Sequence, residues 1–359
     1  MRAVLAPGHL LLAGLAVVLA CAPSSNLSAP PPEPAAVNTD RAALLLDASE
    51  RYGVAFGANE LRPVTPRALD LAHAANIQWV RLGLYWQAIE PRPGELHWQR
   101  YDDLIATARA QRFQVLALLA YATPWATTAP PGAPGNVTHY PPSDQAAWLR
   151  YVTAVVSRYH QDVHAWEVWN EPDFDTFWGG TPAEYASLLA VTYQAIKAVD
   201  PAATVVLGGL GFRDLPGRPA EAFLSQILFD PDHPAAYSFD VASFHHYGSL
   251  DDARRRVAAL QAALAQAGVP RRPIWITETG QASNPSLTYS AEFAGPAGQA
   301  EWLRQTLPSL VALGVARVFW FQLFDVPGDD RGLGLLDATL NPRPAYSALR
   351  GLLAGNAES

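Results

Sequence analysis

The chain has 359 residues, of which 50% are hydrophobic and 16% charged, a composition that provides a large apolar core and excludes an intrinsically disordered protein. Its net charge of −8 and isoelectric point near 5.6 argue against nucleic acid as a partner, because nucleic-acid-binding proteins carry basic surfaces. The densest basic run, at 254–256, lies in a helical pattern and is interpreted as a solvated helix face.

The first forty residues have the composition of an export signal and a linker. Residues 10–20 form an apolar stretch shorter than the about 20 residues that a membrane span needs, which fits a signal peptide. It ends at the single cysteine, Cys21, and the segment 18–21 resembles the lipobox of bacterial lipoproteins, whose cysteine is lipidated; an ordinary cleaved signal is the alternative. We expect a signal peptide at 1–20 and a Pro-, Ser- and Ala-rich linker at 21–40.

This N-terminus predicts an exported protein at the bacterial cell surface or in the periplasm, or otherwise a secreted one. A lipid on Cys21 would be its only attachment to a membrane. No cysteine pair exists for a disulfide, so the fold must rest on its core. We expect a monomer.

From residue 41 to residue 355 the sequence alternates between strand and helix patterns. The strand patterns are nearly continuous apolar runs, as parallel strands covered on both faces have. They lie at 52–58, 77–84, 113–120, 165–169, 204–209, 239–244, 274–277 and 316–322. Amphipathic helical patterns lie between them, for example at 101–112, 144–160, 182–199, 251–267 and 299–313.

Eight strands, each followed by a helical pattern, predict a single-domain (β/α)8 TIM barrel over residues 41–355. A doubly wound open sheet is the alternative. That fold usually carries a glycine-rich phosphate turn after its first strand, and the segment 57–60 lacks the spacing of such a turn.

Charged and polar residues stand where several of these strands end. They are Arg81, Glu171, His245, Tyr247 and Glu278. In a TIM barrel the carboxyl ends of the strands form the active site. Two carboxyl groups that face one pocket can cleave a glycosidic bond, one by protonating the leaving oxygen and the other by attacking the anomeric carbon or activating water. Arg81 beside one acid would keep it ionised, and Tyr247 could donate a hydrogen bond to it.

Aromatic residues form a second concentration near the strand ends. The chain has 11 tryptophans, and Trp86, Trp125, Trp178 and Trp320 lie at strand ends or in the following loops. The flat apolar faces of sugar rings stack on aromatic rings, so we expect these four to contact the substrate. The histidines do not have the spacing of a metal site, so we expect neither a metal nor another cofactor.

At these residues the chain resembles a clan of retaining (β/α)8 glycoside hydrolases that carry their two acids on strands four and seven. Trp-Asn-Glu-Pro at 169–172 matches the clan's Asn-Glu-Pro motif, 276–280 looks like its nucleophile strand, and 243–248 is similar to its strand-six His-x-Tyr-Gly motif. Within the clan, the segment 121–126 looks most like family 39, and family 5 stays open as the alternative.

The resemblance implies roles for individual residues. Glu171 would be the acid/base, Asn170 would bind the sugar 2-hydroxyl, and Glu278 would be the nucleophile. His245 and Tyr247 would line the pocket. The chain ends soon after residue 352, so we expect no accessory sandwich domain of the kind that many family 39 xylosidases carry.

The expected function is hydrolysis of a polysaccharide or oligosaccharide by double displacement. Two alternatives remain open at this point. A carbohydrate-binding surface protein could keep the barrel and have lost activity, although both acids and Asn170 are present. A transglycosylase would use the same two acids and differ only in whether water or a sugar reaches the intermediate.

Overall fold

The computed structural model of the chain describes residues 48–56, 64–212, 219 and 221–355, and for residues 48 and 49 it describes only the backbone. The predicted signal peptide, the linker at 21–40 and Cys21 lie outside these residues and stay predictions. Among the helices of the described part, none is long and apolar enough to cross a membrane.

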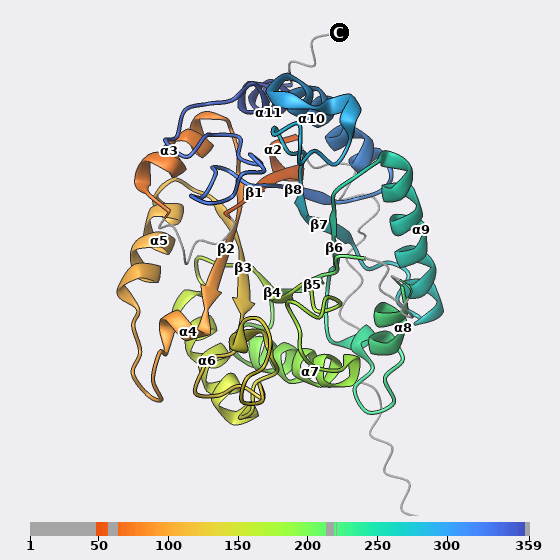
Figure 1. Ribbon diagram of the computed structural model, residues 1–359. Helices are drawn as coiled ribbons and strands as arrows, with labels where there is room; N and C mark the ends of the chain where they lie inside the picture. Colours follow the sequence, from red (N-terminus) through yellow and green to blue (C-terminus); the bar gives the residue numbers. More distant parts are fainter. Residues whose placement is uncertain (1–47, 57–63, 213–218, 220, 356–359) are drawn as a thin grey trace, which may run out of the picture. The chain divides into compact units, whose positions relative to one another are not determined.

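Within the described residues, eight parallel strands form a sheet that closes into a barrel (Figure 1). The strands are β1 (Tyr52–Ala55), β2 (Trp79–Tyr85), β3 (Gln114–Ala120), β4 (Ala165–Asn170), β5 (Thr204–Gly209), β6 (Ala242–His246), β7 (Ile274–Thr279) and β8 (Arg317–Phe321). Strand β1 pairs with β2 on one side and with the last strand, β8, on the other, so an open sheet would leave β5 and β6 as its two edges. Bridges at Val206–Val241 and Leu210–Phe244 join β5 to β6. The predicted TIM barrel is confirmed.

Helices surround this ring of strands (Figure 1). They are α2 (Ala48–Arg51), α3 (Pro66–Ala74), α4 (Trp86–Ile89), α5 (Gln99–Ala110), α6 (Gln145–Tyr159), α7 (Pro182–Val199), α8 (Ala222–Leu228), α9 (Leu250–Gln266), α10 (Gly295–Ala312) and α11 (Pro344–Leu353), with short 3-10 turns η1 (Val137–His139), η2 (Ala235–Tyr237) and η3 (Ala291–Phe293). The five expected helical patterns are α5, α6, α7, α9 and α10. Helix α10 begins earlier than expected because Pro296 lies in its first turn, where proline is tolerated.

Local signals in the sequence account for where several helices begin and end. Helix α7 starts with a capping box, in which the Thr181 hydroxyl accepts from the Glu184 amide at 3.2 Å and the Glu184 carboxylate accepts from the Thr181 amide at 2.7 Å. Gly268 and Gly314 follow α9 and α10 with φ angles of 80° and 92°, which a side chain would strain. These stops let the chain turn directly into the next strand.

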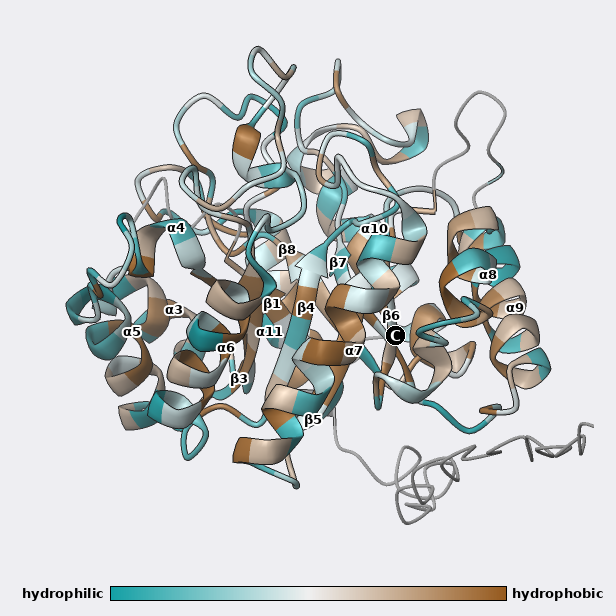
Figure 2. Ribbon diagram, turned by 90° about the horizontal axis from the view of Figure 1, so that it is seen from below, coloured by the Kyte–Doolittle hydropathy of each residue, from teal (hydrophilic) through white to brown (hydrophobic). Residues whose placement is uncertain are grey.

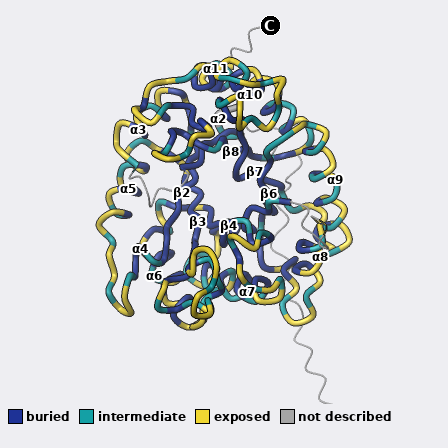
Figure 3. The backbone as a smooth tube through the Cα atoms, in the orientation of Figure 1, coloured by how far each residue is buried: buried dark blue, intermediate teal, exposed yellow. Residues whose placement is uncertain are grey.

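The strands are buried along almost their whole length, and exposure is confined to the outer helix faces and the loops (Figure 3). Inside the barrel, a cluster of strand residues comprises Trp79, Leu116, Ala165, Val206, Val241, Trp275 and Phe319. Apart from Val241, which precedes β6, these residues are among the first three of their strands. Arg317 lies over the rings of Trp79 and Trp275, at 3.8 and 4.5 Å from their centroids. This cluster fills the amino end of the barrel, so the carboxyl end is left for a site.

Candidate active site

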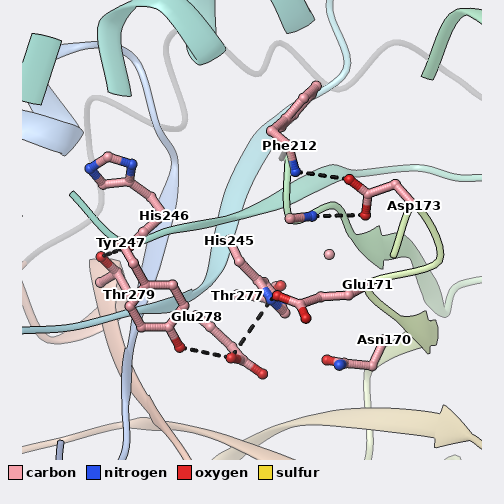
Figure 4. A network of polar contacts seen from close by, with 12 residues as sticks. Asn170, Glu171, Asp173, Phe212, His245, His246, Tyr247, Thr277, Glu278 and Thr279 are labelled. Atoms are coloured by element: carbon pink, nitrogen blue, oxygen red, sulfur yellow. Dashed lines mark hydrogen bonds and ion pairs between the residues drawn. The ribbon is translucent and has the colours of Figure 1, made fainter. Parts of the chain in front are cut away.

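The polar residues expected at strand ends lie together at the carboxyl end of the barrel. Long loops gather on that side of the molecule (Figure 2). Strand β2 carries Arg81, β4 ends at Asn170 with Glu171 directly after it, β6 carries His245, and β7 carries Glu278. Because parallel strands all end at the same edge, residues distant in the sequence meet there (Figure 4).

Arg81 binds three side chains at once. Its Nε donates to Glu167 Oε2 at 2.5 Å, and its two terminal nitrogens donate to Glu278 Oε1 at 2.7 Å and to Asn170 Oδ1 at 2.9 Å. The residue is only 5% exposed. Burial acts against its charge, but the carboxylates of Glu167 and Glu278 raise the pKa of Arg81 above its usual range. The guanidinium therefore stays positive and fixes Glu278 and Asn170 relative to each other.

Glu278 is held as a carboxylate. Burial by itself raises the pKa of a carboxyl group, but the charges of His245 and Arg81 and hydrogen bonds from Tyr247 and Arg81 lower the pKa of Glu278 below its ordinary value. The Tyr247 hydroxyl donates to Glu278 Oε2 at 2.8 Å. Burial, and next the Glu278 charge, raise the pKa of Tyr247 well above its ordinary value, so this hydroxyl stays a donor.

His245 lies between the two glutamates. Its Nδ1 is 2.9 Å from Glu171 Oε1 and 3.6 Å from Glu278 Oε2. Burial opposes protonation of the imidazole, but the carboxylates of Glu278 and Glu171 raise the pKa of His245 above its ordinary value. A proton on Nδ1 can thus hydrogen-bond to Glu171, and its charge also lies close to Glu278.

The same distances limit the separation of the two acids. The distance between Glu171 Oε1 and Glu278 Oε2 cannot exceed the sum of their distances from His245 Nδ1, which are 2.9 Å and 3.6 Å. Inverting glycosidases place their carboxyl groups about 6.5–9.5 Å apart and retaining ones about 5–5.5 Å apart. Only a straight line through the nitrogen would reach the lower edge of the inverting range, so the geometry favours retention.

The backbone turns sharply to present Glu171. Trp169 and Glu171 have φ angles of 71° and 44°, values that non-glycine residues adopt at an energetic cost and often at functional sites. The Glu171 amide donates to the Gly209 carbonyl at 3.1 Å, which ties the end of β4 to β5. A side chain on Gly209 would lie 2.2 Å from His245 Nε2, so a glycine is required beside the imidazole.

Asp173 fastens the loop that follows Glu171. Its two oxygens accept from the backbone amides of Gly211 and Phe212, each at 2.9 Å (Figure 4). Burial, with a smaller contribution from the Glu171 carboxylate, raises the pKa of Asp173 to about 6 against these hydrogen bonds. The loops after β4 and β5 are thereby joined beside the acid/base candidate.

Two of the four tryptophans predicted to contact substrate are fully buried. Trp86 Nε1 donates to Glu90 Oε2 at 2.8 Å, and Trp320 Nε1 donates to the Leu333 carbonyl at 3.0 Å. Neither ring has an exposed face for a sugar. The prediction of direct contact is corrected for both: their rings pack in the core that supports the site, because the strand-end position does not decide which way a side chain points.

Trp178 and Trp125 differ from each other. Trp178 is also buried, its Nε1 donates to the Thr181 carbonyl at 3.0 Å, and its ring packs edge-on against Trp169, so it too supports the wall. Trp125 is half-buried, with its Nε1 donating to the Glu90 carbonyl at 3.0 Å. Of the four, Trp125 keeps a surface that a substrate can reach.

Sequence reasoning missed two residues of the site, Glu167 and Tyr289. Glu167 lies on β4 and is fully buried against Arg81; an acid inside an apolar strand was the signal that could have found it. Tyr289, in the loop after β7, is 38% exposed, and its ring centroid lies 5.1 Å from that of Tyr247. Nothing local in the sequence marks this loop residue, because only folding brings it beside Tyr247.

The two adjacent histidines face opposite ways, as alternation along a strand requires (Figure 4). His245 enters the site and His246 points away from it, toward Asp252 on α9 at 3.8 Å. In the described ranges, no group of three or more His, Cys, Asp or Glu side chains is arranged to hold a metal ion.

The fold and the paired glutamates define the class of (β/α)8 glycoside hydrolases with acids on strands four and seven. Residues 51–320 match the family described as Cellulase (glycosyl hydrolase family 5). The chain belongs to this family.

The chain is also similar to individual glycoside hydrolases. A beta-xylosidase from Geobacillus stearothermophilus is 30% identical over 176 residues, which are 42% of this chain but only 34% of that enzyme. The structure of a monomeric beta-xylosidase from Caulobacter crescentus CB15 has a TM-score of 0.68 at 19% identity and covers 86% of this chain and 69% of that one. A family 39 glycoside hydrolase from Bacteroides cellulosilyticus WH2 has a TM-score of 0.65 at 20% identity, over 86% and 65% of the two chains.

These likenesses bear on the choice between families 39 and 5. The similarity to solved family 39 structures is a similarity of fold. The family match itself is to family 5, the alternative that the sequence left open. The predicted class of glycoside hydrolase is confirmed.

Proposed function

We propose that this protein is a retaining glycosidase that hydrolyses O-glycosidic bonds of a polysaccharide or oligosaccharide by double displacement. The observation that carries the proposal is the unequal setting of the two glutamates. Arg81 and Tyr247 both donate to Glu278, whereas Glu171 has His245 as its hydrogen-bond partner. Unequal surroundings give two identical side chains different tasks.

In the first step, a Glu278 oxygen attacks the anomeric carbon, and the bond to the leaving oxygen breaks. Glu171 gives its proton to that oxygen, so Glu278 ends as a neutral glycosyl ester and Glu171 as a carboxylate. Asn170 directly precedes Glu171 in the chain, and its Oδ1 accepts from Arg81 at 2.9 Å. Its amide nitrogen is then free to donate to a sugar hydroxyl next to the reacting carbon.

In the second step, the Glu171 carboxylate takes a proton from water as the water attacks the anomeric carbon. The ester bond breaks, and its electron pair returns to Glu278. A proton on His245 Nδ1 stabilises whichever carboxylate carries the charge, since that nitrogen is close to both. Two displacements on one carbon preserve its configuration.

The substrate proposal rests on relatives and on the rim of the site. Two of the three relatives named above are beta-xylosidases, and the family that the chain matches is described as Cellulase (glycosyl hydrolase family 5). Trp125 and Tyr289 keep partly exposed rings at the rim, and such rings stack on pyranose faces. Aryl β-xylosides and β-glucosides, with xylan and cellulose oligosaccharides, are the first compounds to test.

The experiment is an assay of wild type beside Glu278→Ala on these compounds, followed by proton NMR of the first sugar released. We expect product with retained configuration from wild type, and at least about a 10⁴-fold lower rate from the variant. Initial release of the opposite anomer would contradict double displacement. Tight glycan binding without any product would identify a carbohydrate-binding protein. Transfer to a sugar acceptor in preference to water would identify a transglycosylase.

A further inference from the structure

Glu167 is a buried carboxylate that the two-step mechanism does not use. It lies on β4 with 0% exposure. Its Oε2 accepts from Arg81 Nε at 2.5 Å, and its Oε1 accepts from the Gly209 amide at 3.1 Å and from the Thr277 hydroxyl at 2.8 Å. Both oxygens are therefore satisfied by partners on three other strands, so the carboxylate is held in one position.

The charge on Arg81 explains why a second acid matters here. In the resting enzyme, Arg81 faces two carboxylates, those of Glu167 and Glu278. When Glu278 becomes a glycosyl ester, its negative charge is lost. A buried arginine without a counter-ion is strongly unfavourable, and Glu167 is the carboxylate that remains beside it.

We propose that Glu167 is a positioning residue that balances the charge of Arg81 through the catalytic cycle. In the free enzyme it shares Arg81, which leaves Glu278 with enough negative charge to attack. In the ester intermediate it stays as the counter-ion of Arg81, so that loss of the Glu278 charge leaves no buried cation unpaired. The kinetic part of this inference rests on the proposed function; its electrostatic part does not.

The electrostatic part can be measured without any substrate. Glu278→Gln imitates the uncharged state of the ester, and Glu167→Gln keeps the size of the side chain but removes its charge. Each single variant leaves Arg81 with one carboxylate, whereas the double variant leaves it with none. We expect each single variant to fold, and the double variant to lose more in melting temperature than the two single losses combined, by about 5 °C or more.

A matched pair of variants provides the control. Glu90 is another buried glutamate at the same end of the barrel, where it accepts from Trp86 Nε1 and from the Gly94 amide instead of Arg81. Glu90→Gln combined with Glu278→Gln should show additive losses. Additive losses for Glu167 and Glu278, or failure of Glu167→Gln alone to fold, would overturn the charge-balance proposal.

The kinetic part is tested on an aryl glycoside with a good leaving group. Without the Glu167 charge, Arg81 acts fully on Glu278, which makes it a weaker nucleophile and a better leaving group. We expect Glu167→Gln to lower kcat/KM by about tenfold or more, to leave ester hydrolysis as fast as in wild type or faster, and to move the acid limb of kcat/KM to lower pH. Thr277→Val removes one hydrogen bond to Glu167 but no charge, so its acid limb should not move.

The two failures can be told apart. A wild-type protein without glycosidase activity would contradict the proposed function, while the melting temperatures would still decide the role of Glu167. Normal activity in wild type with equal slowing of both steps in Glu167→Gln, and no shift in pH, would reduce Glu167 to a structural residue.

Discussion

Glu171 and Glu278 are identical side chains whose surroundings differ at atomic detail. Arg81 and Tyr247 donate to Glu278 at 2.7 and 2.8 Å, while the Glu171 carboxyl group is hydrogen-bonded to His245 Nδ1 at 2.9 Å. Each added donor favours the ionised form of a carboxyl group. In the proposed mechanism, neighbours from other strands thus make the difference between the acid/base and the nucleophile.

Replacing Arg81 tests this difference through pH. Burial raises the pKa of the Glu278 carboxyl, while His245 and Arg81 lower it. Arg81→Gln removes one of the charges that oppose burial, so the pKa of Glu278 rises and the acid limb of kcat/KM moves to higher pH. We expect activity to fall at least about 100-fold. Arg92→Gln, which removes only an exposed ion pair with Glu95, is the control. An acid limb at the wild-type pH in Arg81→Gln would contradict the assignment.

Tyr289 is expected to contact the sugar. Its partly exposed ring packs on Tyr247, whose hydroxyl binds Glu278. Tyr289→Ala should lose about 0.5–1.5 kcal/mol of stacking, a two- to tenfold fall in kcat/KM for an aryl glycoside, with little change in melting temperature. Tyr237, 51% exposed in the turn that precedes β6, lies before the strand instead of after it. An equal loss of activity in Tyr237→Ala would show that the effect is not local to the site.

The polar residues of the site could be predicted from the sequence, but whether each tryptophan ring points into the core or toward the site could not. Glu171 and Glu278 interrupt apolar strands, and that break is visible in the sequence. Trp86 and Trp320 lie at equally suggestive positions and are buried. A large aromatic ring satisfies the same local pattern whether it faces the core or the cleft, so only packing decides.

At the scale of elements, strand β6 shows how far a pattern can predict. The expected strand at 239–244 is observed at Ala242–His246. Its pairing with β7 shifts register between Phe244 and His245, a local irregularity that re-aims side chains at active sites. The alternation of two adjacent histidines could be predicted, but the register that turns His245 toward Glu171 comes from pairing with β7.

His246 should make stability depend on pH. Burial lowers the pKa of His246 to about 4, with Arg256 lowering it and Asp252 acting against this. Among the described residues, its ring nitrogens have no hydrogen-bond partner. An unfolded histidine has a pKa of about 6.5, so the unfolded chain takes up this proton first as pH falls. Stability is therefore lost from about pH 6.5 down to about pH 4, by about 3 kcal/mol in all.

His246→Leu removes that loss. We expect the variant to gain stability relative to wild type as pH falls across this window, measured by urea unfolding at several pH values. His164→Gln changes an exposed histidine and should follow wild type. A constant difference between His246→Leu and wild type at all pH values would show that His246 does not titrate in this way.

At the scale of the whole molecule, closure of the barrel is what assembles the site. Arg81 and Glu278 are 197 residues apart in the sequence, and Thr277 and Glu167 are 110 apart. They meet because all eight strands of the described part are parallel and end at one rim. The alternation of strands and helices predicts that rim, since each apolar run marks a strand and each break marks its end.

Export of the whole protein is a proposal from its N-terminal sequence. If Cys21 is lipidated, the full-length protein produced in a bacterial host should sediment with membranes and incorporate labelled palmitate. Cys21→Ser should then appear in the soluble fraction with unchanged glycosidase activity, because the cysteine precedes the barrel. Equal membrane association of Cys21→Ser and wild type would contradict a lipid anchor at this residue.

The sequence by itself predicted the fold class, the clan of glycoside hydrolases and the two candidate acids, because apolar periodicity and strand-ending glutamates are local properties of the chain. The tertiary structure alone decided that Arg81 is shared between Glu167 and Glu278 and that His245 lies between the acids. It also decided that most of the predicted tryptophan contacts are core packing. These are distances between strands far apart in the sequence, and local pattern carries no information about them.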